Sequence, residues 1–319
     1  MLEQKLSSSI DLDAIVPILM NNETITRGKF QDNEAVGTDT IMNDLLERAA
    51  GSVASKQGRA YLRRGTSGTA SGIVFVESSE WDTNHFGISM GRLPLVMFDH
   101  RVNTAERREL LSEAFNHEPY EMVSARVNLL DNLTIQALEQ KGGILTDVLL
   151  TFRFDSSWLL PGLLARVRAT EARPEDHDIL TSKSEKMFAI DRFHSDPNLS
   201  RAKSDQLYSK WVSNSFRGLA DCILVVREKD EPVGFITCKI ERVGQSFKYG
   251  VIDLIAVDPS EAGRGLGSAL VHSALEWFAP RVSSVYVGTQ AANIQAVRLY
   301  EKAGFRHASS EATFHIWSS

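Results

Sequence analysis

The chain has 319 residues, of which 43% are hydrophobic and 24% charged, and its formal net charge is −6 at pH 7. This length suits two ordinary domains, and the hydrophobic content excludes a disordered or fibrous protein. The acidic balance argues against a general nucleic-acid partner, and no run approaches the ~18 apolar residues of a membrane-spanning helix, so we expect no membrane partner either.

The first part of the chain, residues 1–72, is poorly patterned. Its opening residues include acidic side chains and lack the charged-then-apolar order of a secretory signal, so we expect a cytoplasmic protein. Residues 64–72 are rich in glycine, serine and threonine, which is typical of a flexible join. We therefore expect residues 1–72 to form a loosely attached extension, whose role the sequence leaves open.

An internal repeat links the two halves of the chain. The segment NLTIQALEQKGG at residues 132–143 aligns with NIQAVRLYEKAG at residues 293–304. Strands are expected at residues 73–77 and 122–127, with a helix at residues 105–115 between them. Residues 73–155 are therefore expected to be a degenerate copy of the fold of the C-terminal half, with Glu139 in the place of Tyr300 and no glycine loop before its last helix.

The C-terminal half, residues 165–319, follows a connector at residues 156–164 and begins with an expected strand at residues 165–172. Strands are expected at residues 222–226 and 233–240, with turns around residues 229–232 and 244–245. Cys222 and Cys238 lie on these two strands and have no histidine or cysteine partners at metal-binding spacing. We expect buried free thiols and no metal site.

A glycine-spaced loop is the most informative feature of this half. An apolar strand runs to Asp258 and Pro259, Gly263, Gly265 and Gly267 follow, and an apolar stripe at helical spacing continues to Phe278. Unsatisfied N–H groups at a glycine-lined helix start form an anion cradle, which suits a diphosphate. The spacing fits neither a dinucleotide fingerprint nor a nucleoside triphosphate loop. A tight strand-to-helix turn without a ligand is the alternative reading.

This order of strand, loop and helix resembles motif A of the GCN5-related N-acetyltransferase (GNAT) superfamily, in which the loop holds the pyrophosphate of acetyl-coenzyme A. The resemblance covers residues 73–319. It implies an α/β (α+β) fold, a tandem GNAT-like arrangement with a mixed central sheet flanked by helices and a degenerate N-terminal copy. Ala262 departs from the arginine or glutamine that the family usually has, and Arg264 is expected to replace part of that charge. The cofactor-binding residues implied are Ile255, Ala256, Val257, Gly263, Arg264, Gly265, Leu266, Gly267, Ser268 and Asn293.

The helix expected at residues 294–302 carries LYEKAGF, which resembles motif B of the same superfamily. The resemblance makes Tyr300 the catalytic general acid, placed to protonate the departing thiolate. It also gives Asn293 a contact with the pantetheine arm. From the residues alone, Tyr300 could be a half-buried aromatic on an amphipathic helix, and Asn293 a helix cap.

Two further segments resemble the dTDP-fucosamine acetyltransferase group of this superfamily. They are WDTNHFG at residues 81–87, and DRFHSDP at residues 191–197, which precedes a helix with Tyr208 and Trp211. The resemblance implies a nucleotide-linked amino sugar as acceptor, with Asp191, Arg192 and His194 as substrate-binding residues. The aromatic residues of these segments could equally be packing contacts.

The expected function is N-acetyl transfer from acetyl-coenzyme A to the amine of a nucleotide-linked amino sugar by direct attack. A GNAT enzyme for peptide or antibiotic amines and a non-catalytic acetyl-coenzyme A sensor are the alternatives. Asp253, Asp191 and His194 are all candidates for the general base. The exact acceptor and the oligomeric state, including a homodimer, stay open.

Overall fold

The computed structural model describes residues 12–22, 28–66, 68–158 and 168–318. The chain divides into two compact units. The first unit consists of Met1–Val148 and Ser309–Ser319, and the second unit consists of Leu149–Ala308. Most of the expected connector and the first three residues of the strand expected at residues 165–172 fall on residues 159–167, which lie outside the described residues. The described part of that expected strand is extended only at Thr170–Glu171, which form β6.

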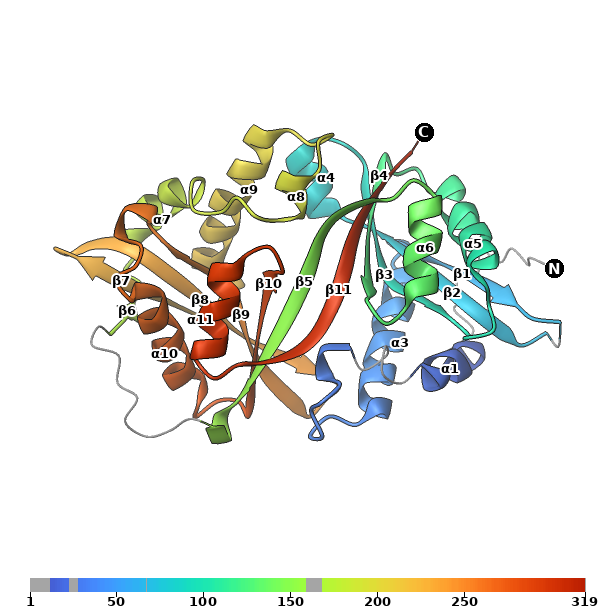
Figure 1. Ribbon diagram of the computed structural model, residues 1–319, viewed down its shortest axis with the longest axis horizontal. Helices are drawn as coiled ribbons and strands as arrows, with labels where there is room; N and C mark the ends of the chain where they lie inside the picture. Colours follow the sequence, from blue (N-terminus) through green and yellow to red (C-terminus); the bar gives the residue numbers. More distant parts are fainter. Residues whose placement is uncertain (1–11, 23–27, 67, 159–167, 319) are drawn as a thin grey trace. The chain divides into compact units, whose positions relative to one another are not determined.

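The first unit is built on a mixed sheet of five strands in the order β1-β2-β3-β4-β11. Only β3 and β4 pair in parallel; the other neighbours are antiparallel. The strands are β1 (Gly58–Arg64), β2 (Ala70–Ser78), β3 (Met90–Phe98), β4 (Met122–Asn128) and β11 (Arg306–Trp317). The helices are α1 (Leu12–Asn21), the short η1 (Gly28–Phe30), α3 (Thr38–Ala54), α4 (Glu80–Phe86), α5 (Thr104–His117) and α6 (Asn132–Gln140) (Figure 1).

The expectation of a loose extension at residues 1–72 is wrong for the described part of that segment. Ile15, Ile18 and Leu19 of α1 are almost fully buried, and they belong to one core cluster with Met42 and Leu46 of α3. The same cluster includes residues of β2 and β3, and β1 pairs along its whole length with β2. Residues 58–64 are therefore a strand of the sheet, and the two helices complete the core of the first unit.

The second unit has a mixed sheet in the order β5-β10-β9-β8-β7-β6. Its strands are β5 (Ile144–Asp155), β7 (Cys222–Glu228), β8 (Glu231–Val243), β9 (Phe247–Val257) and β10 (Ser284–Gln290), besides β6. Its helices are η2 (Ser156–Trp158), α7 (Asp176–Ser184), α8 (Arg192–Ser195), α9 (Arg201–Asn214), the π-helical turn η3 (Ser215–Leu219), η4 (Pro259–Glu261), α10 (Leu266–Phe278) and α11 (Ile294–Lys302). The predicted meander, glycine loop and last two helices are confirmed, as is the tandem arrangement of mixed sheets with flanking helices.

Each copy of the repeat contributes its last strand to the sheet of the other unit. Residues 149–155 of β5 pair antiparallel with β10, within the second unit. Residues 311–317 of β11 pair antiparallel with β4, within the first unit. The compact units therefore differ from the expected limits at residues 73–155 and 165–319, because hydrogen-bonded pairing, and not chain order, decides which sheet a strand joins.

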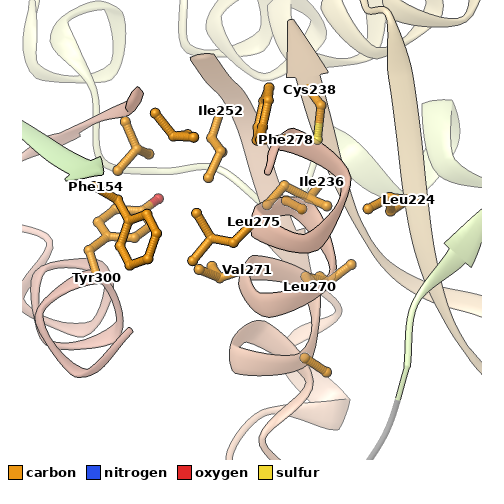
Figure 2. Close-up of a cluster of buried hydrophobic side chains, with 14 of the residues drawn as sticks. Phe154, Leu224, Ile236, Cys238, Ile252, Leu270, Val271, Leu275, Phe278 and Tyr300 are labelled. Atoms are coloured by element: carbon orange, nitrogen blue, oxygen red, sulfur yellow. The ribbon is translucent and has the colours of Figure 1, made fainter. Parts of the chain in front are cut away.

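The core of the second unit lies between α10 and the sheet, and it extends to α11. The apolar stripe of α10, including Leu270, Leu275 and Phe278, packs with Ile236 and Ile252 of the central strands (Figure 2). Close packing explains one glycine of β9, since a Cβ on Gly250 would come within 2.6 Å of the Phe278 ring. Full burial of such a stripe is the main source of helix stability, because it removes apolar surface from water.

Cys222 and Cys238 are buried free thiols of this core, as predicted. They lie directly opposite each other on β7 and β8. Burial raises the pKa of the Cys222 thiol to about 11 and raises that of Cys238 as well. Both thiols are therefore protonated near neutral pH and behave as small apolar side chains.

Candidate functional site

The central feature of the site is the point at which β9 and β10 stop pairing. Their parallel ladder joins residues 250–252 to residues 285–287 only, although β9 continues to Val257 and β10 to Gln290. On its other edge, β9 stays paired with β8 as far as Val257, across a register shift opposite Asp253 and Leu254. The shift is bridged by a side chain, since the Leu254 N–H donates to Thr237 Oγ1 at 2.8 Å.

The unpaired edge of β9 carries the backbone groups of Ile255 and Val257. The N–H of Asp258 donates to the carbonyl oxygen of Val233 at 2.7 Å, so this residue faces β8. Backbone direction alternates along a strand, so Ala256 faces β8 too, while Ile255 and Val257 face the edge where the β10 ladder has ended. An extended ligand could pair with this edge as a further strand would.

The glycine loop opens directly onto the N-terminus of α10. Gly263 has φ +80° and Gly265, the N-cap residue, has φ +78°, both in the left-handed region that favours glycine. A Cβ built on either residue meets no heavy atom within 4 Å. No side chain caps the helix, so the N–H groups of Leu266, Gly267 and Ser268 keep their capacity to donate. With the helix dipole, they form a cradle for an anion.

Arg264 does not supply free positive charge to this cradle. Its guanidinium donates to Glu228 at 2.6 Å and also to Glu261. These carboxylates raise the pKa of Arg264 and offset its charge. The charge that Arg264 was expected to supply in place of Ala262 is thus shared with two acids, and the positive potential of the loop comes mainly from the helix N-terminus.

Tyr300 belongs to the buried core of the second unit. Its ring is 2% exposed and packs on Phe152 and Phe305, with centroid separations of 6.0 and 5.8 Å. The hydroxyl makes no hydrogen bond within the described part of the chain, and it points away from α11 (Figure 2). Burial raises the pKa of the phenol, so it stays protonated at neutral pH.

Asn293 is the N-cap residue of α11, as predicted. Its Oδ1 accepts a hydrogen bond from the Ala296 N–H at 3.1 Å. The side chain is half-buried, and its amide Nδ2 keeps two donors that this bond does not use. Capping and a ligand contact are therefore compatible at this residue.

Asp191 and His194 form a buried network. Asp191 caps the short helix α8 by accepting from the N–H groups of Phe193 and His194, and it also accepts from the Tyr208 hydroxyl at 2.9 Å. His194 Nδ1 bonds to Asp191, and His194 Nε2 lies 3.0 Å from Asp205 Oδ1. Because both ring nitrogens face carboxylates, the pKa of His194 is raised, while these hydrogen bonds lower the pKa of Asp191.

This network leaves little of either side chain for an acceptor. The side chains of His194 and Asp191 are 1% and 5% exposed. Both ring nitrogens of His194 are also occupied by carboxylate partners, so neither is open to take a proton from an acceptor amine. Arg192, the third residue expected to bind substrate, is half-buried, with its guanidinium 4.5 Å from the centre of the Phe193 ring.

A contact that the sequence did not reveal joins α9 to β9. The indole Nε1 of Trp211 donates to Asp253 Oδ2 at 2.9 Å. Burial raises the pKa of the Asp253 carboxyl, against the lowering effect of this hydrogen bond. Trp211 and Tyr208 were visible in the sequence as a pair three residues apart on a helix. The partner of Trp211, on a strand 42 residues later, was not visible.

The first unit has no comparable cradle in its described part. Asn103 and Glu106 close the start of α5 with a reciprocal capping box. The buried Arg107 then bonds to Asp131, the N-cap residue of α6, and to Thr134 Oγ1 at 2.8 Å. A guanidinium thus joins the starts of α5 and α6, whereas in the second unit α10 approaches α11 at Gly267, whose Cβ would lie 3.4 Å from Leu299.

The described part of the chain also lacks a membrane-spanning helix and a metal-binding cluster. No helix there is long and apolar enough to cross a membrane. No cluster of three or more histidine, cysteine, aspartate or glutamate side chains there could hold a metal ion.

Comparison with known proteins identifies the second unit. Residues 187–305 match the model of the acetyltransferase (GNAT) family. The spore coat polysaccharide biosynthesis protein SpsD of Bacillus subtilis is 28% identical over 145 residues, 45% of this chain and 48% of that protein, so the match spans about half of the relative. The dTDP-fucosamine acetyltransferase of Escherichia coli O6:H1 is 24% identical over 233 residues, 72% of this chain and 92% of that protein.

Among solved structures, a tandem GNAT protein from the clavulanic acid biosynthesis pathway superposes with a TM-score of 0.55. The alignment covers 98% of this chain and 97% of that one, at 13% identity, so it shows a shared fold. The glycine loop, the diverging strands and Tyr300 all lie inside the range that the family model matches. Residues 187–305 of this chain are therefore an acetyltransferase domain of the GNAT family.

Proposed function

We propose that this protein transfers the acetyl group of acetyl-coenzyme A to the amine of a nucleotide-linked amino sugar. The observation that carries the proposal is the uncapped, glycine-lined start of α10 in the same unit as the unpaired edge of β9. The open space at Gly263 and Gly265 suits a diphosphate, and the edge at Ile255 and Val257 suits the amides of a pantetheine arm.

Each proposed binding residue has a defined part. The N–H groups of Leu266, Gly267 and Ser268 would hold the diphosphate, and the backbone groups of Ile255 and Val257 would pair with the pantetheine, with Ala256 between them held on β8. Asn293 Nδ2 would add a side-chain donor. Acetyl-coenzyme A supplies an acetyl group activated as a thioester.

The proposed chemistry is direct acyl transfer without a covalent enzyme intermediate. The amine nitrogen bonds to the acetyl carbon, the carbon–sulfur bond breaks, and the leaving thiolate takes the proton of the Tyr300 phenol. The proton lost by the amine passes to Asp253, directly or through water. Among the three candidate bases, we favour Asp253 because Asp191 and His194 are committed to each other and buried.

The acceptor class is inferred from the relatives and from one side chain. One relative is named for spore coat polysaccharide biosynthesis and another for acetylation of dTDP-fucosamine. A nucleotide diphosphate handle needs positive charge and donors at the acceptor side, which Arg192 can supply. Asp191 and His194 would then act indirectly, by holding the start of α8 in place.

The test is a thiol-release assay on the full chain with acetyl-coenzyme A. The acceptors are dTDP-linked 4-amino-4,6-dideoxyhexoses, the matching free sugars, polyamines and peptides with free N-termini. We expect the dTDP conjugates to be far better substrates than the free sugars, because binding of the remote nucleotide positions the amine. A preference for peptides or polyamines would contradict the amino-sugar acceptor and favour an enzyme for those amines. Binding of acetyl-coenzyme A without acetylation of any amine would indicate a non-catalytic sensor.

A further inference from the structure

The contact between α9 and β9 extends the proposed function. We infer that Trp211 is a positioning residue that aims the Asp253 carboxylate, and that the hydrogen-bonded cluster of Asp191, His194, Asp205 and Tyr208 fixes Trp211 for this task. The inference rests on the proposed acetyl transfer, in which Asp253 receives the amine proton. It also gives the DRFHSD segment a function that does not require contact with substrate.

The position of Asp253 on its strand makes a positioning partner necessary. Asp253 is the first residue of β9 beyond the ladder with β10, and it lies opposite the register shift with β8. Such an irregularity bends a strand and re-aims its side chains. One side-chain partner of the carboxylate is a single indole N–H, at 2.9 Å. Trp211 therefore selects the direction in which the other carboxylate oxygen faces.

Trp211 is itself held by a stack of aromatic rings. Its ring lies 6.1 Å from that of Tyr208 at an interplanar angle of 14°, and Tyr208 stacks on Phe188 at 4.1 Å and 7°. The Tyr208 hydroxyl donates to Asp191, and His194 bridges Asp191 to Asp205. A continuous series of contacts thus links the start of α8 to the carboxylate on β9. A hydrogen-bonded network whose central side chains, Asp191 and His194, are buried restricts those side chains to one arrangement.

Three neighbouring side chains influence the pKa of the Asp253 carboxyl. Trp211 on α9 and Lys239 on β8 lower the pKa of its carboxyl, whereas Glu241 on β8 raises it. Glu241 is bonded to the Tyr249 hydroxyl at 2.8 Å and lies 3.7 Å from Lys239 Nζ, so its charge is partly offset. Burial is the largest influence, and the net direction is upward. Removing the indole donor leaves burial less opposed and raises the pKa of Asp253 further.

The first experiment measures kcat/KM for the acceptor as a function of pH in wild type, Trp211→Phe and Asp253→Asn. A base must be deprotonated to act, so the wild-type rate falls on the acid side as Asp253 takes up a proton. In Trp211→Phe we expect this acid limb to move to higher pH and the rate to fall by about tenfold, as for a lost hydrogen bond to a charged group. Asp253→Asn should lower the rate by ~10²–10⁴ and remove the limb.

A second measurement does not depend on turnover. The five tryptophans are replaced with 5-fluorotryptophan, and fluorine NMR spectra of the free protein are recorded across pH. We expect the Trp211 resonance, assigned by its absence in Trp211→Phe, to titrate with Asp253 and to stop titrating in Asp253→Asn. Tyr208→Phe, which cuts the bond to Asp191, should broaden or shift the same resonance.

Trp277→Phe is the matched control, since Trp277 is a half-buried tryptophan of α10 whose recorded ring contacts are Phe278 and Arg281. It should leave the pH profile unchanged. The inference is overturned if Trp211→Phe keeps the wild-type pH profile, or if the Trp211 resonance shows no titration that depends on Asp253. If the wild type acetylates no amine, the proposed function fails, and the fluorine titration still decides whether Trp211 and Asp253 are coupled.

Discussion

Burial has opposite chemical consequences for the two side chains to which we assign proton transfer. It raises the pKa of Tyr300, a group already protonated at neutral pH, and so preserves a proton donor. It also raises the pKa of Asp253, which makes that carboxylate a stronger proton acceptor than an exposed one. Desolvation of the charged form thus acts in the same direction on the proposed acid and the proposed base.

At the residue scale, we predict that Tyr300→Phe lowers kcat by ~10²–10⁴, the usual contribution of general acid catalysis, with little change in KM for acetyl-coenzyme A. The hydroxyl acts mainly as charge develops on the leaving sulfur, so its loss affects the transition state more than ground-state binding. Steady-state kinetics with thiol detection measures both constants. The control is Tyr61→Phe, which removes the hydroxyl of a buried tyrosine in the first unit. An unchanged kcat in folded Tyr300→Phe, with chemistry rate-limiting, would remove Tyr300 from the mechanism.

The element that defines the site is the junction of β9, the glycine loop and α10. Two glycines with positive φ turn the chain sharply enough for the helix to begin without a side-chain cap. The same helix start in the first unit is closed by a capping box. One helix start therefore leaves its backbone donors without a side-chain cap, while its counterpart satisfies them internally.

At the element scale, we predict that Gly265→Val raises the dissociation constant for acetyl-coenzyme A by more than about tenfold, or 1.4 kcal/mol. A branched side chain is strained at positive φ and also occupies the space where the loop backbone would approach the diphosphate. Isothermal titration calorimetry measures the constant.

Gly142→Val is the matched control for backbone strain. Gly142 has φ +88°, and a Cβ there also meets no heavy atom within 4 Å, but the residue follows α6 in the first unit. The Gly142→Val variant should lose about as much stability as Gly265→Val and keep its affinity for acetyl-coenzyme A. Equal affinities in the two variants would mean that the loop does not bind the diphosphate.

The whole molecule combines two units of similar fold with unequal helix starts. The buried Arg107, tied to Asp131 and Thr134, occupies the first unit between the starts of α5 and α6. Removing either partner of such a buried pair would leave an uncompensated charge, so the arrangement resists opening. The last strand of the first repeat, β5, nevertheless contributes to the core of the second unit, because its Phe152 packs on Tyr300.

At this scale, we predict that acetyl-coenzyme A binds at one site per chain. The counterpart of α10 in the first unit, α5, is closed by a capping box, and no helix start in the described part of that unit follows two positive-φ glycines as α10 does. Calorimetric titration of the full chain measures the stoichiometry. Titration of Gly265→Val should then show no residual tight site. Two equivalent sites in the wild type would contradict the view that the first unit has lost the cofactor.

Local pattern in the sequence determined a large part of this protein. Helix α11, its cap at Asn293 and the start of α10 after Gly265 follow from short-range rules of periodicity and capping, and the structure places them where those rules predict. The glycine loop likewise identified the family, because its conformation depends on residues adjacent in the chain. Whether the ten cofactor-binding residues and Tyr300 act as the resemblance implies stays a prediction.

Only the tertiary structure decided the rest. The exchange of β5 and β11, the packing of α1 and α3, and the bond from Trp211 to Asp253 all join segments far apart in the sequence. The sequence suggested that His194 binds the acceptor. In the structure its two ring nitrogens bond to Asp191 and Asp205, and its side chain is buried. Short-range pattern fixes which element a segment forms. Long-range packing decides which elements come into contact and which polar groups are thereby desolvated. This packing cannot be inferred from short stretches of sequence.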